Sequence, residues 1–199
     1  MSRELTLADI ADLRAYERDR EALRARVIEA KKLRRVPVGP VLSVVFENAM
    51  TIRFQVQEMV RAERMLSDEA VQAELDAYNP LIPGPGQLSA TLFVELTTRD
   101  ELEEWLPKLV GVERALVLRV GGAGETTAIR CRVDPGHAAQ LTREEATASV
   151  HYVGFDVPPH LVDGWLETPV ELAVEHPDYR YSTLLSAATK QSLLDDLRA

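Results

Sequence analysis

The chain has 199 residues, which is enough for one well-buried core but short for two independent globular domains. A hydrophobic fraction of 46% and a charged fraction of 28% are ordinary for a globular protein and leave no room for a large disordered region. The net charge of -9 repels a phosphate backbone, so binding to nucleic acid or to an anionic membrane is disfavoured. The longest apolar runs are far shorter than the roughly 20 residues that a membrane-spanning helix requires.

The first residues of the chain lack the basic start and apolar core of a signal peptide, so we expect a cytoplasmic protein. The single cysteine, Cys131, cannot form an internal disulfide, and it excludes a cysteine-rich zinc or iron–sulfur site carried by this chain alone. The cofactor is therefore unknown: cysteine clusters bind none, and a histidine-ligated metal stays open.

A long helix is predicted at the start of the chain. Thr6 followed by Asp9 is typical of a helix N-cap, and helical periodicity continues to about Leu33. Its highly charged middle, residues 14–21, is predicted to bridge solvent or to contact a partner. The prolines and glycine of residues 36–40 end the helix. We therefore expect one domain, 1–199, with a helical arm over 1–36 and an α+β core over 37–199.

Positive charge gathers at the C-terminal end of this helix. A solvated helix end that complements the helix dipole is the favoured interpretation, ahead of an acidic partner and of nucleic acid. No aromatic side chains are interleaved with these charges, so bases would have no stacking platform. The residues concerned are Arg24, Arg26, Lys31, Lys32, Arg34 and Arg35.

Alternating and β-branched segments predict the strands. Residues 41–46 and 51–56 are predicted to form an antiparallel hairpin, and residues 88–97 alternate between an apolar and a partly polar face. Gly121 to Gly124 is interpreted as a hairpin loop, because no Lys-Ser/Thr pair or helix follows as a phosphate-binding loop requires. The expected fold is α+β: a mainly antiparallel sheet of six or seven strands, helices on one side and a long N-terminal helix.

Two groups of polar residues are candidate sites. The first is a ligand or partner groove on the polar face of the predicted strands and the helix that follows them. Its alternative is a structural ion-pair network. The candidate residues are Arg53, Gln55, Glu58, Arg61, Thr91 and Glu95.

The second group comprises His137, His151 and His176, which tertiary folding could bring together with a carboxylate to bind iron, zinc or manganese. No local spacing such as His-Glu-x-x-His supports that metal site. A partly buried, hydrogen-bonded histidine is the alternative for His151, and an inert buried thiol is expected for Cys131.

A rigid proline- and glycine-rich segment runs from Tyr78 into the strand that ends near Glu95, and we expect it to be a shaped loop beside a groove. With this segment, the chain resembles a bacterial family described as a domain of unknown function. The resemblance extends over most of the chain, including Arg53-Phe54-Gln55, Glu104-Trp105-Leu106-Pro107, Ala138-Ala139-Gln140-Leu141-Thr142, Ser149-Val150-His151-Tyr152 and His176-Pro177. It carries no established activity. It implies a setting of peroxide defence or electron transfer, beside rubrerythrin-like proteins and iron–sulfur oxidoreductase subunits.

Three functions follow as hypotheses. The first is an accessory or interaction protein that docks onto a rubrerythrin-like or iron–sulfur oxidoreductase partner, with a homodimer as a further open arrangement. The second is a histidine-ligated metalloprotein or redox enzyme, although the sequence holds no recognisable catalytic motif. The third is a small-ligand binding module that uses the polar strand face.

Overall fold

The computed structural model describes residues 4–122, 124–133 and 147–198. Its helices are η1 (Leu7–Asp9), α1 (Leu13–Arg34), α2 (Ala49–Ala62), α3 (Asp68–Tyr78), η2 (Asn79–Leu81), α4 (Arg99–Lys108), η3 (Val112–Arg114), α6 (Pro159–Asp163) and α7 (Ala187–Leu197). Its strands are β1 (Arg35–Val38), β2 (Leu42–Glu47), β3 (Gln87–Val94), β4 (Leu116–Gly121), β5 (Thr126–Arg130), β6 (Arg132–Val133), β7 (Val150–Asp156), β8 (Val170–His176) and β9 (Tyr179–Leu184). Among the described residues, no helix is long and apolar enough to cross a membrane.

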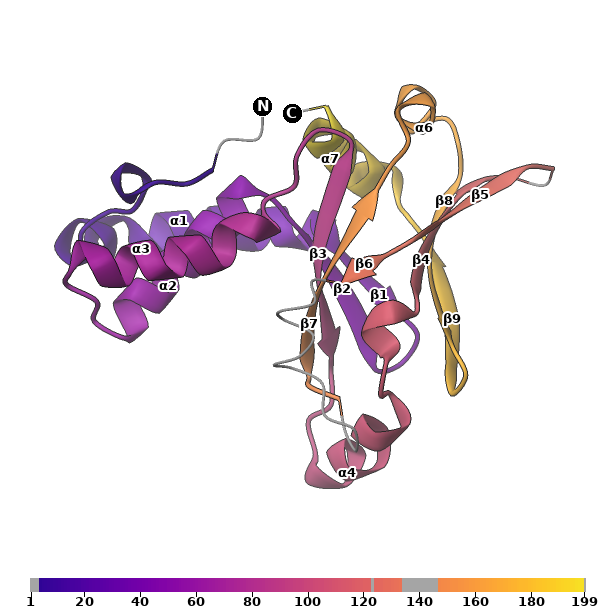
Figure 1. Ribbon diagram of the computed structural model, residues 1–199, viewed down its shortest axis with the longest axis horizontal. Helices are drawn as coiled ribbons and strands as arrows, with labels where there is room; N and C mark the ends of the chain where they lie inside the picture. Colours follow the sequence, from indigo (N-terminus) through magenta and orange to yellow (C-terminus); the bar gives the residue numbers. More distant parts are fainter. Residues whose placement is uncertain (1–3, 123, 134–146, 199) are drawn as a thin grey trace.

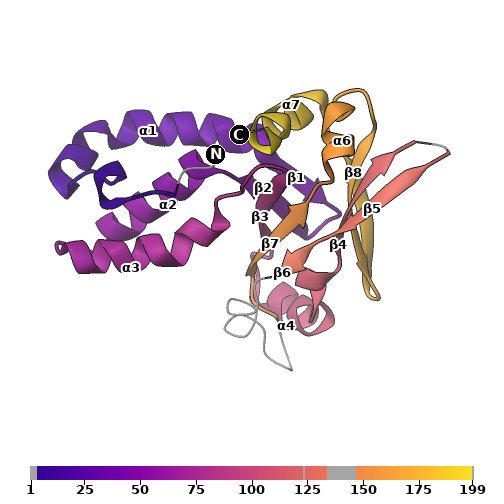
Figure 2. The ribbon, with the colours of Figure 1, turned by 45° about the horizontal axis from the view of Figure 1, so that its top comes forward.

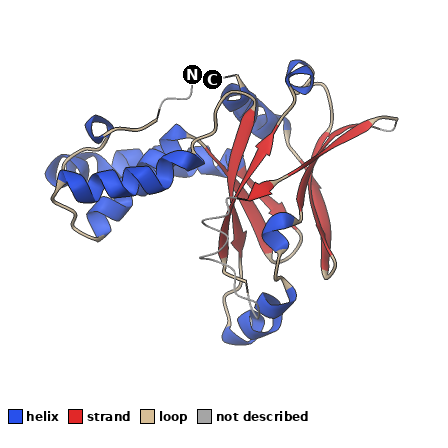
Figure 3. Cartoon of the chain, in the orientation of Figure 1, coloured by secondary structure: helices blue, strands red, loops and turns tan. Residues whose placement is uncertain are grey.

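The expected α+β class with antiparallel strands and a long N-terminal helix is confirmed, and the strands divide between two sheets. A five-stranded sheet has the order β1-β2-β3-β7-β6, and a four-stranded sheet has the order β5-β4-β8-β9. Every recorded pair is antiparallel. Helices α1, α2 and α3 form a layer over the side of the five-stranded sheet that faces away from the four-stranded sheet (Figures 1 and 3).

The main apolar core lies between the two sheets. It draws on one face of each sheet and on α7, with members such as Phe46, Leu92, Leu118 and Leu193 at 0% exposure. The chain passes from one sheet to the other at Cys131, which separates β5 from β6. On the opposite margin β9 meets β1, where the Tyr179 hydroxyl donates to Val38 O over 2.7 Å. The two sheets therefore close around a single core, with α7 near one end and α4 at the other (Figures 1 and 2).

A second, smaller apolar cluster holds the helical layer together. Ile52, Val56 and Val60 of α2 recur at helical spacing and pack with Leu75 of α3. The short helix η1 also packs here, and its Thr6–Asp9 capping box is present as predicted. The long helix begins later than expected, at Leu13, because the Asp12 carboxylate accepts from the backbone of residues 14 and 15.

The hairpin predicted over residues 41–56 is wrong in its second half. Residues 51–56 belong to α2, and β2 pairs with β1 and β3 instead. Asn48 starts the helix: its side chain accepts from Thr51 N over 3.1 Å, and the Thr51 hydroxyl accepts from Asn48 N over 2.9 Å. This capping box overrides the strand propensity of the β-branched and aromatic residues that follow.

Candidate functional site

A cavity of about 210 Å³ lies between the helical layer and the outer face of the five-stranded sheet. The sheet forms its floor and the three helices with η2 form its walls. Its lining residues are Lys31, Glu47, Ile52, Gln55, Tyr78, Leu81, Thr91, Phe93, Val150 and Tyr152. We call this space the Glu47 cavity. Polar side chains in a concave, largely apolar space are typical of small-molecule sites.

Strand register gathers the polar groups of the floor. Thr91 on β3 lies opposite Val45 on β2 and Tyr152 on β7, so Glu47, two residues along β2, shares its face of the sheet. The Thr91 hydroxyl donates to Glu47 Oε1 over 2.8 Å. The other face of the same strands enters the core between the sheets, which leaves this face to the cavity.

Glu47 is only 5% exposed, yet its Oε2 has no hydrogen-bond partner among the described residues. Lys31 in the last turn of α1 forms a long ion pair with it: Nζ lies 4.0 Å from Oε2, too far for a hydrogen bond. Buried polar atoms are nearly always hydrogen-bonded, so a carboxylate oxygen without a hydrogen-bond partner on a residue that lines a cavity requires an explanation. A bound ligand that donates to Oε2 supplies one.

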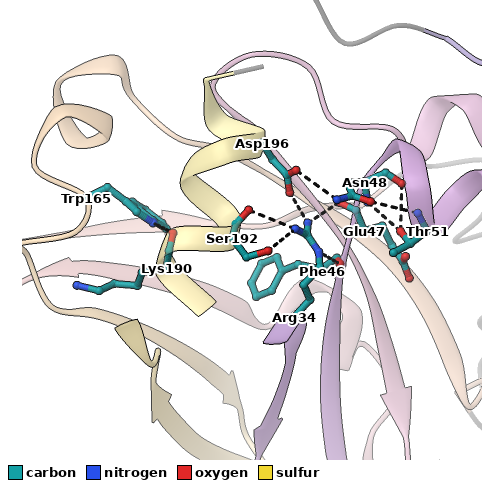
Figure 4. Close-up of polar contacts among 9 residues, drawn as sticks. All are labelled: Arg34, Phe46, Glu47, Asn48, Thr51, Trp165, Lys190, Ser192 and Asp196. Carbon is teal, nitrogen blue, oxygen red and sulfur yellow. Dashed lines mark hydrogen bonds and ion pairs between the residues drawn. The ribbon is translucent and has the colours of Figure 1, made fainter. Parts of the chain in front are cut away.

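Arg34 fixes the backbone around this carboxylate. Its guanidinium is buried and donates to Phe46 O over 2.7 Å and to Glu47 O over 3.1 Å. The same group binds Ser192 and Asp196 on α7 (Figure 4). Burial raises the pKa of Asp196, and the Arg34 charge opposes that rise. The expectation that the whole basic run is a solvated helix end is therefore wrong for Arg34, which ties α1 to β2 and α7.

Tyrosines close one side of the Glu47 cavity. Tyr78 ends α3 and Tyr152 stands on β7, and burial together with the neighbouring Tyr78 hydroxyl raises the pKa of Tyr152 to about 12. The Tyr152 hydroxyl therefore remains protonated at neutral pH and can donate a hydrogen bond. The two tyrosines supply polar contacts beside Lys31 and Glu47.

The proline segment lies beside the cavity, as a shaped loop next to a groove. Asn79 secures its start, because the side-chain amide accepts from Leu5 N and donates to Leu5 O, both over 2.9 Å. Pro80 and Pro83 help to line a groove of about 400 Å³ that shares Leu81 and Tyr152 with the Glu47 cavity. The segment therefore forms part of the wall of both spaces.

The sequence-predicted groove residues separate into two groups. Gln55 and Thr91 line the Glu47 cavity. Arg53 is exposed on α2. Glu95 forms an ion pair with Arg35 at the edge of the sheet and also binds Ser43.

The remaining two, Glu58 and Arg61, join α2 to α1. Glu58 accepts from the Tyr16 hydroxyl over 2.6 Å and from two nitrogens of Arg20, each over 2.8 Å. The Arg20 guanidinium holds the pKa of Glu58 at about 2, below its ordinary value of 4.5. Arg61 pairs with Glu17. These contacts form a structural ion-pair network, which was the alternative to a ligand groove. They use part of the charged segment of α1, residues 14–21, that was predicted to bridge solvent or to contact a partner.

The histidines occupy separate places. His151 is 1% exposed on the core side of β7, where its Nε2 lies 2.7 Å from Thr147 Oγ1, and burial lowers its pKa. His176 ends β8, and its Nε2 lies 3.0 Å from Val110 O. His137 lies outside the described residues. Within the described parts of the chain, no group of three or more His, Cys, Asp or Glu residues is placed to hold a metal ion. The three-histidine site stays a prediction.

Cys131 and Glu113 form a further, partly buried contact on the core side. The thiol donates to Glu113 O over 3.2 Å, and burial raises the pKa of Cys131 to about 11. A thiol with this pKa is a poor nucleophile at neutral pH. Glu113 is 2% exposed and also has an Oε2 without a hydrogen-bond partner among the described residues, but it does not line the Glu47 cavity.

Sequence reasoning missed four polar residues of the cavity: Lys31, Glu47, Tyr78 and Tyr152. The alternation of β3 correctly placed Thr91 on a polar face, and the same period applied to β2 puts Glu47 on that face once the strands pair. The Asn48–Thr51 capping box was the signal that a helix follows Glu47. No local sequence pattern indicates that Lys31 and Tyr78 lie against this sheet, because their positions depend on how the helices pack.

The fold and the cavity together define an α+β protein with a helical layer over an antiparallel sheet and, between them, a small cavity that carries several polar side chains. The profile of the family described as "Protein of unknown function (DUF3501)" matches residues 4–197. The chain belongs to the DUF3501 family, which confirms the expected membership of a family of unknown function.

One solved structure shares the fold along nearly its whole length. It is a crystal structure of a novel protein of unknown function from Burkholderia pseudomallei K96243, 32% identical to this chain, with a TM-score of 0.87. The similarity covers 98% of this chain and 100% of that one. Among curated proteins, none matches this chain.

Proposed function

We propose that this protein is a small-ligand binding module and that its ligand occupies the Glu47 cavity. The observation that carries the proposal is Glu47 Oε2, a buried carboxylate oxygen without a hydrogen-bond partner among the described residues, on a residue that lines a cavity of about 210 Å³. Leaving such an atom without a partner costs about 1–3 kcal/mol or more, which a ligand that donates a hydrogen bond would recover.

Other contacts support a site that is formed before the ligand binds. Thr91 holds one oxygen of the Glu47 carboxylate, and Arg34 holds the backbone carbonyl of the same residue. The carboxylate therefore has one fixed orientation, with Oε2 left for a ligand. A preformed site loses less conformational freedom on binding than one that must be ordered.

A screen of small polar metabolites tests the proposal. Binding is measured by the thermal shift of the wild-type protein, of Glu47→Gln and of Glu113→Gln. Glu113 is the matched control, because it is another buried glutamate with an unpartnered oxygen but does not line the cavity. We expect at least one compound to stabilise the wild type and Glu113→Gln but not Glu47→Gln. If every compound that stabilises the wild type also stabilises Glu47→Gln, the proposal is contradicted.

A second candidate is the accessory function, with a rubrerythrin-like or iron–sulfur oxidoreductase partner in an oxidative-stress or electron-transfer system. We place the contact with the partner at the two most exposed leucines of the described residues, Leu66 at 86% and Leu184 at 64%. Purification of the tagged protein from its own cells tests this function. Co-purification of such a partner, lost in Leu66→Asp or Leu184→Asp, would support it, and recovery of neither partner class would contradict it.

A further inference from the structure

The ligand class of the Glu47 cavity follows from the charges at its wall, and this inference rests on the proposed function. Glu47 and Lys31 carry opposite charges, and their Oε2 and Nζ atoms stand 4.0 Å apart without a hydrogen bond between them. The Lys31 side chain is 29% exposed and that of Glu47 is 6% exposed. Each group therefore retains hydrogen-bonding capacity that a ligand can use.

Charge balance selects among ligands. A simple cation would pair with Glu47 but meet Lys31 with a like charge, and a simple anion would pair with Lys31 but face Glu47. Both arrangements place a repelled charge in a partly desolvated site. A ligand with an ammonium and a carboxylate on neighbouring atoms compensates both groups at once.

The rest of the cavity is suited to a short apolar substituent. Ile52, Leu81, Phe93 and Val150 supply apolar surface, and the volume of about 210 Å³ limits the ligand to a small molecule. We propose that the Glu47 cavity binds a free α-amino acid with a small apolar side chain. Its ammonium donates to Glu47 Oε2 and its carboxylate accepts from Lys31 Nζ.

Three probes of matched carbon skeleton test this inference by titration calorimetry. L-Valine carries both charges, isobutylamine lacks the carboxylate and isovalerate lacks the ammonium. We expect the wild-type protein to bind L-valine at least tenfold more tightly than either of the other two. Equal binding of isobutylamine or isovalerate would overturn the zwitterion assignment.

Charge variants give a reciprocal test. Glu47→Gln leaves Lys31 as the charged group and is expected to prefer isovalerate. Lys31→Met leaves Glu47 and is expected to prefer isobutylamine. Glu113→Gln is expected to keep the wild-type order. Circular dichroism and thermal unfolding establish that each variant is folded before it is titrated.

The outcomes separate this inference from the function on which it rests. If a ligand of another class binds in a Glu47-dependent way and L-valine does not, the binding function stands and the zwitterion assignment is wrong. If neither the three probes nor any compound of the metabolite screen binds in a Glu47-dependent way, both are wrong.

Discussion

The Thr91 hydroxyl donates to Glu47 Oε1 across neighbouring strands, while Oε2 of the same carboxylate has no hydrogen-bond partner among the described residues. This half-satisfied state costs stability, because a buried acceptor has lost its water without a replacement. Binding sites often retain such arrangements, since their residues are not optimised for the stability of the free protein.

Removal of the Thr91 hydroxyl tests how much the carboxylate depends on it. Thr91→Val leaves Glu47 without its hydrogen bond and should lower the free energy of unfolding by about 1–3 kcal/mol. In a Glu47→Leu background the same change should cost less, because the buried acceptor has gone. Urea unfolding of the two single variants and the double variant measures this coupling, and strictly additive effects would contradict it.

Arg34 and Arg35 are neighbours in sequence but differ in burial, so substitution of Arg35 is the matched control for substitution of Arg34. The Arg34 side chain is 2% exposed and pairs with Asp196, whereas that of Arg35 is 45% exposed and pairs with Glu95. Arg34→Met should lower the free energy of unfolding by about 3–5 kcal/mol, because it leaves a buried carboxylate unpaired. Arg35→Met should cost about 0–1 kcal/mol. Similar losses for both in urea unfolding would show that Arg34 is not the tie between α1, β2 and α7.

The contact of α1 with α2 should weaken in acid. The pKa of Glu58 is about 2 in the folded protein, against an ordinary value of 4.5. A lowered carboxylate pKa gives stability that is present above 4.5 and is lost as the pH falls toward 2. The side chain is 26% exposed, so solvent screening limits the effect to about 1 kcal/mol.

Unfolding of wild type and Glu58→Gln at pH 7 and at pH 3 measures this contribution. The wild type should be the more stable at pH 7, and the difference should shrink at pH 3. A difference that stays constant between the two pH values would contradict the ionised contact of Glu58 with Arg20.

Gly39 is required where β1 turns toward β2. Its φ is +75°, and a Cβ there would lie 2.4 Å from the Tyr179 hydroxyl oxygen. Gly111 also has a positive φ, +88°, but nothing lies within 4 Å of its Cβ position. Gly111→Ala should therefore cost only the left-handed backbone penalty of about 1–2 kcal/mol. Thermal unfolding should show a clearly larger loss for Gly39→Ala, and equal losses would exclude a contribution from the clash.

Local patterns predicted the features that depend on a few consecutive residues. Alternation in residues 88–97 gave the two faces of β3, and Thr6 with Asp9 gave the first capping box. The pattern failed at residues 51–56, where strand propensity conflicted with the Asn48 cap. The division into two sheets depends on the passage of the chain at Cys131 from β5 to β6, and no local sequence pattern indicates this change of sheet.

The candidate site was predicted only in part for a related reason. Thr91 was found because its strand alternates, and Gln55 was found on an incorrect strand assignment that still placed it near the sheet. Lys31 was grouped with a solvated helix end, since sequence alone does not show that this last turn of α1 is anchored by the buried Arg34. Its approach to Glu47 depends on contacts between α1, β2 and α7, which are far apart in the chain.

A crystal structure of the protein determined with L-valine present tests the central claim most directly. We predict electron density for the amino acid in the Glu47 cavity, with its ammonium at Glu47 Oε2 and its carboxylate at Lys31 Nζ. The crystals are grown at a concentration of L-valine that saturates any binding seen in solution. The claim is contradicted if the cavity then contains only water, or if density for the amino acid lies elsewhere on the protein.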